Sequence, residues 1–154
     1  MKIVKCNWHR KGYTLFFIIL ILFFIQGCSL RLITKYDEKT EEAIFVSTRM
    51  VDQFYGNLFE TDEEKRQYAK YSEKYVEVEA QLNELVLRNK VRVLNKDSTD
   101  IAESILELWR KYKARHKEKD TYKTGVARLD KKRFERIFSY AVRAEGAKKP
   151  TENN

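Results

Sequence analysis

The sequence predicts an all-α fold: a small bundle of about four amphipathic helices that follows a basic and then apolar N-terminal segment. The 154 residues include only five Gly and one Pro, so few residues are available for the many tight turns of a β-rich fold. From Tyr36 onward, apolar side chains recur at steps of three and four residues, the spacing of one face of an α-helix. The length fits a single domain.

The first 25 residues have the order of charge and hydropathy that is typical of an export signal. Residues 1–12 hold four basic side chains and no acidic one: Lys2, Lys5, Arg10 and Lys11. An almost unbroken apolar run follows from Tyr13 to Ile25. In this order the basic end stays in the cytoplasm and the rest of the chain is translocated. An apolar helix of this length would cover about 20 Å, less than the roughly 30 Å of a bilayer core, which favours a signal peptide over a spanning helix.

The apolar run ends in the sequence Ile25-Gln26-Gly27-Cys28, followed by Ser29. This segment resembles the lipobox of bacterial lipoproteins, although Gln26 is larger and more polar than usual and Ile25 stands where Leu is commonest. The resemblance implies that diacylglycerol is attached to the Cys28 thiol and that the signal peptidase cuts between Gly27 and Cys28. It also implies that the new amine receives an acyl chain such as palmitate. In a Gram-negative host, a residue other than Asp after the cysteine implies the outer membrane, on the periplasmic side.

A second interpretation of the same segment is an uncleaved anchor. Residues 13–33 are about long enough to span a bilayer, with Gln26 and Arg31 as the polar interruptions. In the lipoprotein interpretation, residues 1–27 are the signal peptide, 28–36 a lipidated N-terminus and short tether, 37–146 the helical bundle and 147–154 a disordered tail.

The first two helices are predicted from an apolar stripe and a capping motif. The stripe of the first helix, over residues 37–59, contains Ile44, Val51, Phe54 and Leu58. Residues 61–64, Thr-Asp-Glu-Glu, match a capping box, which predicts that the second helix starts there and runs to about Leu94. Its stripe has the clearest period and consists of Tyr68, Tyr71, Tyr75, Val78, Leu82 and Leu85.

Two further helices follow after turn and capping residues. Polar residues at 95–100 predict the start of the third helix, whose apolar positions are Ile101, Ile105, Leu108 and Tyr112. Thr124 and Gly125 mark the next boundary. The fourth helix stops near Gly146 and has the apolar residues Leu129, Phe134, Ile137, Phe138, Tyr140 and Ala141. Short connections favour antiparallel neighbours in a bundle, and heptad-like stripes also permit a homo-oligomer.

The densest charge run is the predicted contact site for a polyanion or a lipid surface. It contains Arg110, Lys111, Lys113, Arg115, Lys117 and Lys119. These cations would either touch anionic head groups or another polyanion, or simply form the solvated end of a helix, where the macrodipole favours cations. Residues 131–133 would extend the patch if the third and fourth helices pack antiparallel.

Other residues capable of chemistry are expected to be structural. Tyr68, Tyr71 and Tyr75 have the spacing of core and core-edge residues, with hydroxyls that reach water, rather than that of a ligand pocket. The acids at 37, 38, 41 and 42 are typical of capping and of a first helical turn. His116 has no evident Ser or Cys partner, so a nucleophilic triad is not expected.

The net charge and the numbers of Cys and His argue against several classes of function. Removing residues 1–27 takes away four of the 31 Lys and Arg side chains and none of the 23 Asp and Glu side chains, which lowers the net charge from +8 to +4. This mild charge, together with export, argues against nucleic acid as a partner. Cys28 and His116 would then each be alone, so neither a disulfide nor a Cys/His metal site is expected within one chain.

No phosphate loop, zinc-hydrolase motif or Cys-x-x-Cys motif is found, and neither an enzyme activity nor a cofactor is expected, apart from the lipid on Cys28. The predicted function is that of a membrane-anchored envelope lipoprotein whose helical domain binds a protein partner or acts as a scaffold. One alternative is an exclusion or immunity lipoprotein of the plasmid or phage type. The other is an uncleaved single-pass membrane protein.

Overall fold

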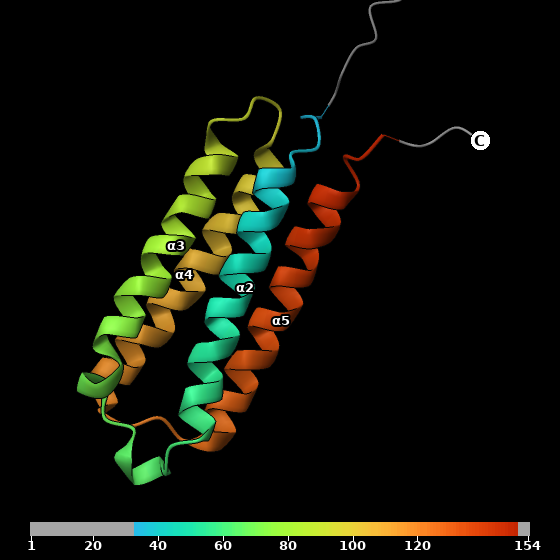
Figure 1. The fold of residues 1–154 in the computed structure, drawn as a ribbon. Coiled ribbons are helices and arrows are strands. Elements are labelled where there is room, and N and C mark those ends of the chain that lie inside the picture. Colours follow the sequence, from blue (N-terminus) through green and yellow to red (C-terminus); the bar gives the residue numbers. More distant parts are fainter. Residues whose placement is uncertain (1–32, 151–154) are drawn as a thin grey trace, which may run out of the picture. The chain divides into compact units, whose positions relative to one another are not determined.

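The computed structural model describes residues 33–150, which form four α-helices and no strand, so the predicted all-α bundle is confirmed (Figure 1). The helices are α2 (Glu38–Phe59), α3 (Ser72–Lys90), α4 (Lys96–Lys119) and α5 (Thr124–Gly146). Each helix packs antiparallel to the next and α2 also packs against α5, which closes a ring of four (Figure 1).

This up-and-down topology places both ends of the described chain at the same end of the bundle (Figure 1). We call this the proximal end, formed by residues 33–37, 90–96 and 146–150. The opposite, distal end is formed by residues 60–71 and 119–124, which connect α2 to α3 and α4 to α5. Among residues 33–150 no helix is both long and apolar enough to span a bilayer. The predicted lipobox, with Gly27 and Cys28, lies outside the described residues.

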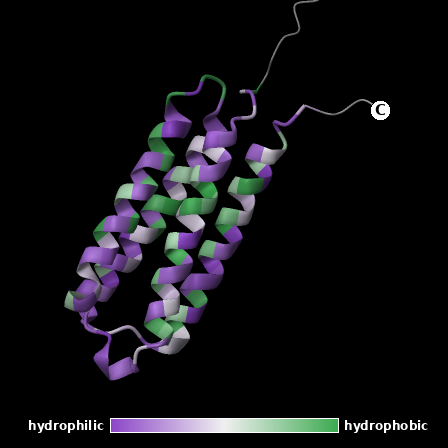
Figure 2. Cartoon of the chain, in the orientation of Figure 1, coloured by the Kyte–Doolittle hydropathy of each residue, from purple (hydrophilic) through white to green (hydrophobic). Residues whose placement is uncertain are grey.

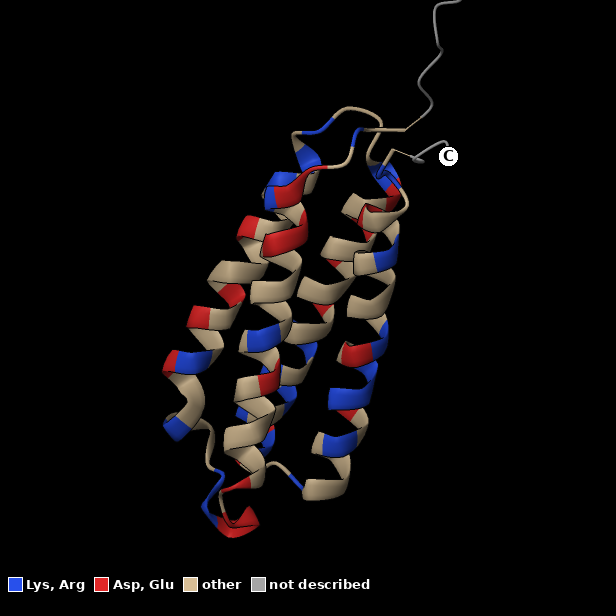
Figure 3. Ribbon diagram, turned by 45° about the vertical axis from the view of Figure 1, so that its right-hand side comes forward, with Lys and Arg blue, Asp and Glu red and all other residues tan. Residues whose placement is uncertain are grey.

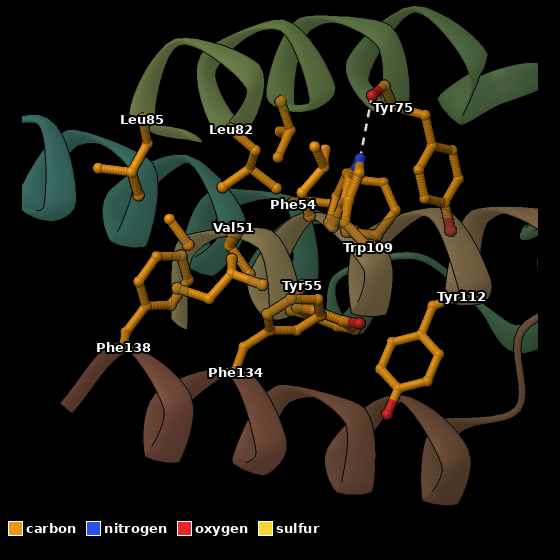
Figure 4. Packing of buried hydrophobic residues seen from close by; sticks show 14 of the residues in the cluster. Val51, Phe54, Tyr55, Tyr75, Leu82, Leu85, Trp109, Tyr112, Phe134 and Phe138 are labelled. Atoms are coloured by element: carbon orange, nitrogen blue, oxygen red, sulfur yellow. Dashed lines mark hydrogen bonds between the residues drawn. The ribbon is translucent and has the colours of Figure 1, made fainter. Parts of the chain in front are cut away.

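The core is built around aromatic rings from all four helices (Figure 4). The Phe54 ring centroid lies 4.6 Å from that of Tyr75 and 4.9 Å from that of Trp109. The Trp109 Nε1–H donates to the Tyr75 carbonyl oxygen at 3.1 Å, so the indole is buried without an unpaired polar atom. Hydrophobic and hydrophilic residues alternate along each helix, as expected where one face is buried (Figure 2).

The predicted capping box at residues 61–64 is wrong. The Thr61 hydroxyl donates to the Asn57 carbonyl at 2.9 Å, at the end of α2, instead of accepting from an amide of the next helix. The Thr61 N–H donates to the Leu58 carbonyl at 3.3 Å and not to Glu64, the acid of the predicted box. The chain forms two short 3₁₀ turns, Glu63–Lys65 and Tyr68–Tyr71, before α3 begins at Ser72.

The structure differs from prediction at one other helix end and at two residues that were expected on a buried face. The second predicted helix ends at Lys90, four residues before Leu94, because the chain turns at that point and α4 begins at Lys96. Leu129 and Tyr140, predicted in the stripe of the fourth helix, are 59% and 50% exposed because they lie beside the buried row and not within it.

The segments that flank the bundle are more ordered than predicted. In the predicted tether, the Thr34 N–H donates to the Leu94 carbonyl at 3.1 Å. In the predicted disordered tail, the Lys148 side chain is 7% exposed and its ammonium donates to Asn95 at 2.7 Å and to Glu145 at 2.6 Å. These contacts are polar, so the lack of apolar residues in both segments does not predict them.

Candidate functional site

The six cations of the predicted contact run divide into two groups. Arg110 and Lys113 point toward α3, where both bind the Glu79 carboxylate, at 2.7 Å and 2.8 Å. Arg115 points toward α5 and binds Asp130 and, at 3.1 Å, the Tyr122 hydroxyl. These three cations join helices within the bundle.

The other three cations of the run, Lys111, Lys117 and Lys119, are exposed. No ion pair of theirs is found within residues 33–150, although the Lys117 ammonium lies 6.0 Å from the centroid of the half-buried Tyr68 ring. These are the exposed cations of the run that are not bound to a carboxylate among the described residues; Arg110 is also exposed, but its guanidinium is bound to Glu79.

The exposed cations are continuous in sequence with a strongly basic α5. Residues 110–143 contain 13 Lys and Arg against four Asp and Glu, a net charge of +9, whereas residues 33–109 contain 11 against 17, a net charge of −6. Figure 3 shows basic residues along the outer side of α5. We call residues 110–143 the basic segment, whose exposed members beyond the run include Lys123, Arg128, Lys132, Arg133 and Arg136. The charge of the bundle is therefore unevenly distributed between its helices.

The predicted extension of the patch through residues 131–133 holds only in part. α4 and α5 do pack antiparallel, and the Arg133 guanidinium donates to the Tyr112 hydroxyl at 2.9 Å across that seam. Lys131 instead faces α2, where its ammonium binds Asp52 at 2.9 Å. Lys132 is exposed.

Beneath the basic segment lies a buried carboxylate that sequence inspection did not single out. Asp130 is 1% exposed and accepts hydrogen bonds from Arg115 and, at 2.6 Å, from the Tyr122 hydroxyl. The Tyr122 hydroxyl also lies 3.3 Å from that of Tyr55. Burial, together with the hydrogen bond to Asp130, raises the pKa of Tyr122, and burial raises that of Tyr55. Both phenols therefore stay protonated and act as donors, not as bases or nucleophiles.

His116 lies inside the same end of the bundle, not among solvated cations. It is 1% exposed; its Nε2 lies 2.8 Å from the Arg66 carbonyl and its Nδ1 lies 3.0 Å from the Tyr75 hydroxyl. A carbonyl only accepts, so Nε2 carries the proton and Nδ1 accepts from Tyr75. Burial lowers the pKa of His116 and keeps the ring neutral. The ring connects α4 to α3 and to the turn that contains Arg66.

Arg66 holds the distal connections together. Its side chain donates to the carbonyls of Thr61 and Tyr122 at 2.8 Å and 3.1 Å, and to the Thr124 hydroxyl at 2.9 Å. The residue is 4% exposed, so its charge is enclosed by backbone oxygens. Nothing local in the sequence marks it, since its acceptors lie up to 58 residues away.

The tyrosines and acids considered as ligand groups have structural positions. Tyr71 and Tyr75 are buried and Tyr68 stacks on Tyr75, 5.6 Å between ring centroids. The hydroxyl of Tyr75 binds His116, so the expectation that it reaches water is wrong. Asp37 caps α2 by accepting from the Thr40 N–H at 3.0 Å, as predicted from first-turn acids.

The proximal end has a second buried carboxylate, Glu145, 1% exposed. The Arg92 guanidinium binds its two oxygens at 2.9 Å and 3.0 Å, and the Asp37 N–H and the Lys148 ammonium donate to it at 2.9 Å and 2.6 Å. Burial alone would raise the pKa of Glu145, but these hydrogen bonds outweigh burial and lower it. The network joins the start of α2, the α3–α4 connection and the end of α5.

The described residues do not assemble a recognisable reaction centre. No group of three or more His, Cys, Asp or Glu side chains within residues 33–150 is placed to hold a metal ion. The buried titratable groups are already paired with protein partners, and the arrangement joins helices while leaving the exposed cations of the basic segment free for recognition. No protein-family model, curated protein or solved structure matches the chain.

Proposed function

We propose that this chain is a bacterial lipoprotein, held in the membrane by lipid on Cys28, whose helical bundle acts by binding an envelope protein and not by catalysis. The observation that carries the proposal is the sequence Ile25-Gln26-Gly27-Cys28 directly after a basic and then apolar segment. A diacylglycerol and an amide-linked acyl chain together give stable membrane attachment where a single chain would not. In a Gram-negative host, Ser29 favours the outer membrane on the periplasmic side.

Metabolic labelling with a palmitate analogue tests the anchor. We expect label on the wild-type chain, none on Cys28→Ser, and undiminished label on Cys6→Ser, the matched control at the other cysteine. Globomycin, which inhibits the lipoprotein signal peptidase, should cause the precursor to accumulate. An unlabelled and unprocessed wild-type chain would refute lipidation and favour residues 13–33 as an uncleaved anchor.

The basic segment is the surface we propose for the partner, which should present an acidic face. Among the cations of the original run, Lys111, Lys117 and Lys119 are exposed and have no ion pair within residues 33–150, while Arg110, Lys113 and Arg115 bind carboxylates of the bundle. Charge complementarity of this kind mainly determines which partner is selected and how fast it associates.

Charge reversal tests whether the exposed lysines of the basic segment bind the partner. The variant Lys111→Glu/Lys117→Glu/Lys119→Glu should lose the crosslinked partner that the wild type captures in native membranes. The matched control reverses three exposed cations outside the basic segment, Lys39, Arg49 and Lys70, and should retain it. Equal losses in both triple variants would refute a role specific to the basic segment, and turnover of a substrate by the purified chain would refute the non-enzymatic assignment.

A further inference from the structure

The α3–α4 connection at the proximal end reverses the usual distribution of side chains in a loop. Its apolar residues Val91, Val93 and Leu94 are 73%, 84% and 60% exposed. Its polar residues point inward: the Asn95 side chain is buried and the Arg92 guanidinium binds buried Glu145. Solvated connections ordinarily present their polar residues to water, so this inversion needs an explanation outside the bundle.

The connection is held rigidly in this inverted arrangement. The Asn95 Nδ2 donates to the backbone and side-chain oxygens of Asn89 at 3.0 Å and 2.9 Å, and its Oδ1 accepts from the Lys148 ammonium at 2.7 Å. Arg92 also donates to the Lys35 carbonyl. The exposed apolar side chains are therefore presented by a fixed backbone and not by a loop that can turn them inward.

Leu94 occupies a backbone conformation that its side chain disfavours. Its φ is 57°, in the left-handed region where Gly or Asn is the usual residue. A leucine side chain does not stabilise the turn in this backbone conformation. Its exposed side chain is therefore better explained by a contact that the described residues do not provide.

Ile33 enlarges the apolar surface. It is 54% exposed, and the hydrogen bond from the Thr34 N–H to the Leu94 carbonyl places it next to the connection. Ile33 and Leu94 line one shallow hollow together with Ala144 and Ala147 at the end of α5. Figure 2 shows hydrophobic residues in the α3–α4 connection at this end of the bundle. We call Ile33, Val91, Val93 and Leu94 the apolar tip.

The position of the apolar tip in the chain indicates what covers it. Ile33 lies five residues after Cys28, and five extended residues reach at most about 18 Å. A lipid on Cys28 therefore keeps the proximal end close to the bilayer. Lys90 is paired with Glu103 at 2.6 Å and Lys96 with Asp100, and the exposed Asp97 also lines the hollow, so attraction to anionic lipid is not what this surface offers.

We propose that the apolar tip inserts into the interfacial region of the bilayer to which the chain is anchored, so that the bundle stands on its proximal end. This inference rests on the proposed membrane attachment through the N-terminal segment. Apolar side chains on a rigid support enter the boundary between head groups and acyl chains without anionic lipid, whenever a tether keeps them there.

The test uses the full, lipidated chain in vesicles of phosphatidylcholine, some of which carries a doxyl quencher on its acyl chain. In the mature chain Cys28 is a thioether and Cys6 has been removed, so Val93→Cys supplies the one free thiol for an environment-sensitive fluorophore. The matched control is Val76→Cys, the same change at a 60% exposed valine on α3, about 22 Å along the helix from Val91.

We expect several-fold stronger quenching and a larger blue shift for the label at position 93 than at position 76. Equal and weak quenching at both positions in an acylated chain would overturn the inference and leave the lipoprotein assignment intact. Disulfide-linked dimers through position 93, without quenching, would also overturn it, because the tip would then cover a second copy.

A failure of the anchor assignment is recognised separately, by the absence of acyl label on Cys28. In that case the comparison is made in a Cys6→Ser/Cys28→Ser background, with residues 13–33 as the anchor. The same difference between positions 93 and 76 then decides the inference.

Discussion

The substitution Asp130→Asn tests whether the distal polar network stabilises the bundle. Asp130 is 1% exposed and accepts hydrogen bonds from the Tyr122 hydroxyl at 2.6 Å and from Arg115. Asparagine keeps the shape and one acceptor oxygen, but it removes the negative charge and turns an amide donor toward donors of the neighbouring side chains.

The expected loss follows from the exposure of the partners. Removing one member of a buried ion pair costs about 3–5 kcal/mol when the other charge is left without compensation. Arg115 is 30% exposed, so water recovers part of the loss. A hydrogen bond to a charged acceptor contributes about 1.5–3 kcal/mol. We therefore expect Asp130→Asn to lower the free energy of unfolding by about 2–4 kcal/mol.

Urea unfolding of the detergent-solubilised chain, followed by circular dichroism at the helix band, measures this change. The control is Glu77→Gln, which breaks the exposed pair with Lys74 and should change stability by no more than the error of the measurement. Combining Asp130→Asn with Arg115→Met should recover part of the loss, because the uncompensated cation is gone. A loss below about 1 kcal/mol for Asp130→Asn would refute the assignment of a stabilising buried carboxylate.

Three further predictions concern single residues. Because burial lowers the pKa of His116, the unfolded chain takes up a proton below its ordinary value of 6.5 before the folded chain does. As the pH is lowered from 6.5 to about 5, the unfolding free energy should then fall by up to about 1.4 kcal/mol per pH unit. This range lies above the ordinary pKa values of the carboxylates. In His116→Gln, urea midpoints should lose this dependence; an unchanged slope would contradict the buried neutral ring. Leu94→Gly should raise the unfolding free energy by about 0.5 kcal/mol, because removing the backbone strain at a φ of 57° outweighs the entropy cost of Gly. A lower unfolding free energy in the same urea assay would show that the Leu94 side chain stabilises the bundle. Trp109→Ala, at a fully buried ring, should cost about 3–5 kcal/mol by urea denaturation, and a cost below about 2 kcal/mol would show that the aromatic core refills the space.

The helices were predictable because each one is encoded locally. The stripe through Val51, Phe54 and Leu58 is buried along its length, and Asp37 caps α2 as first-turn acids lead one to expect. The bounds were less predictable where two local patterns compete. At residues 61–64 the capping motif is present, but the N–H and the hydroxyl of Thr61 donate to the last turn of α2, at Leu58 and Asn57, so this residue ends one helix instead of starting the next.

The polar networks depend on residues distant in sequence, and periodicity does not predict such pairs. Arg92 and Glu145 are separated by 53 residues, and Asp130 joins α5 to α4. A signal was nevertheless present, because Asp130 lies in register with Ala127 and Phe134 on the buried face of α5. A charged residue in register with a buried stripe indicates a charged partner, although only the fold identifies which one.

The length of the bundle determines how far its distal cations lie from the membrane. α5 has 23 residues and is therefore about 35 Å long. At physiological ionic strength an electrostatic potential decays over about 8 Å. In a bundle that stands on its proximal end, Lys117 and Lys119 lie several such decay lengths from the bilayer, so the head groups of the chain's own membrane neither attract nor neutralise them. The apolar tip and the distal cations can then be occupied at the same time, one by lipid and the other by a partner in the aqueous space beyond.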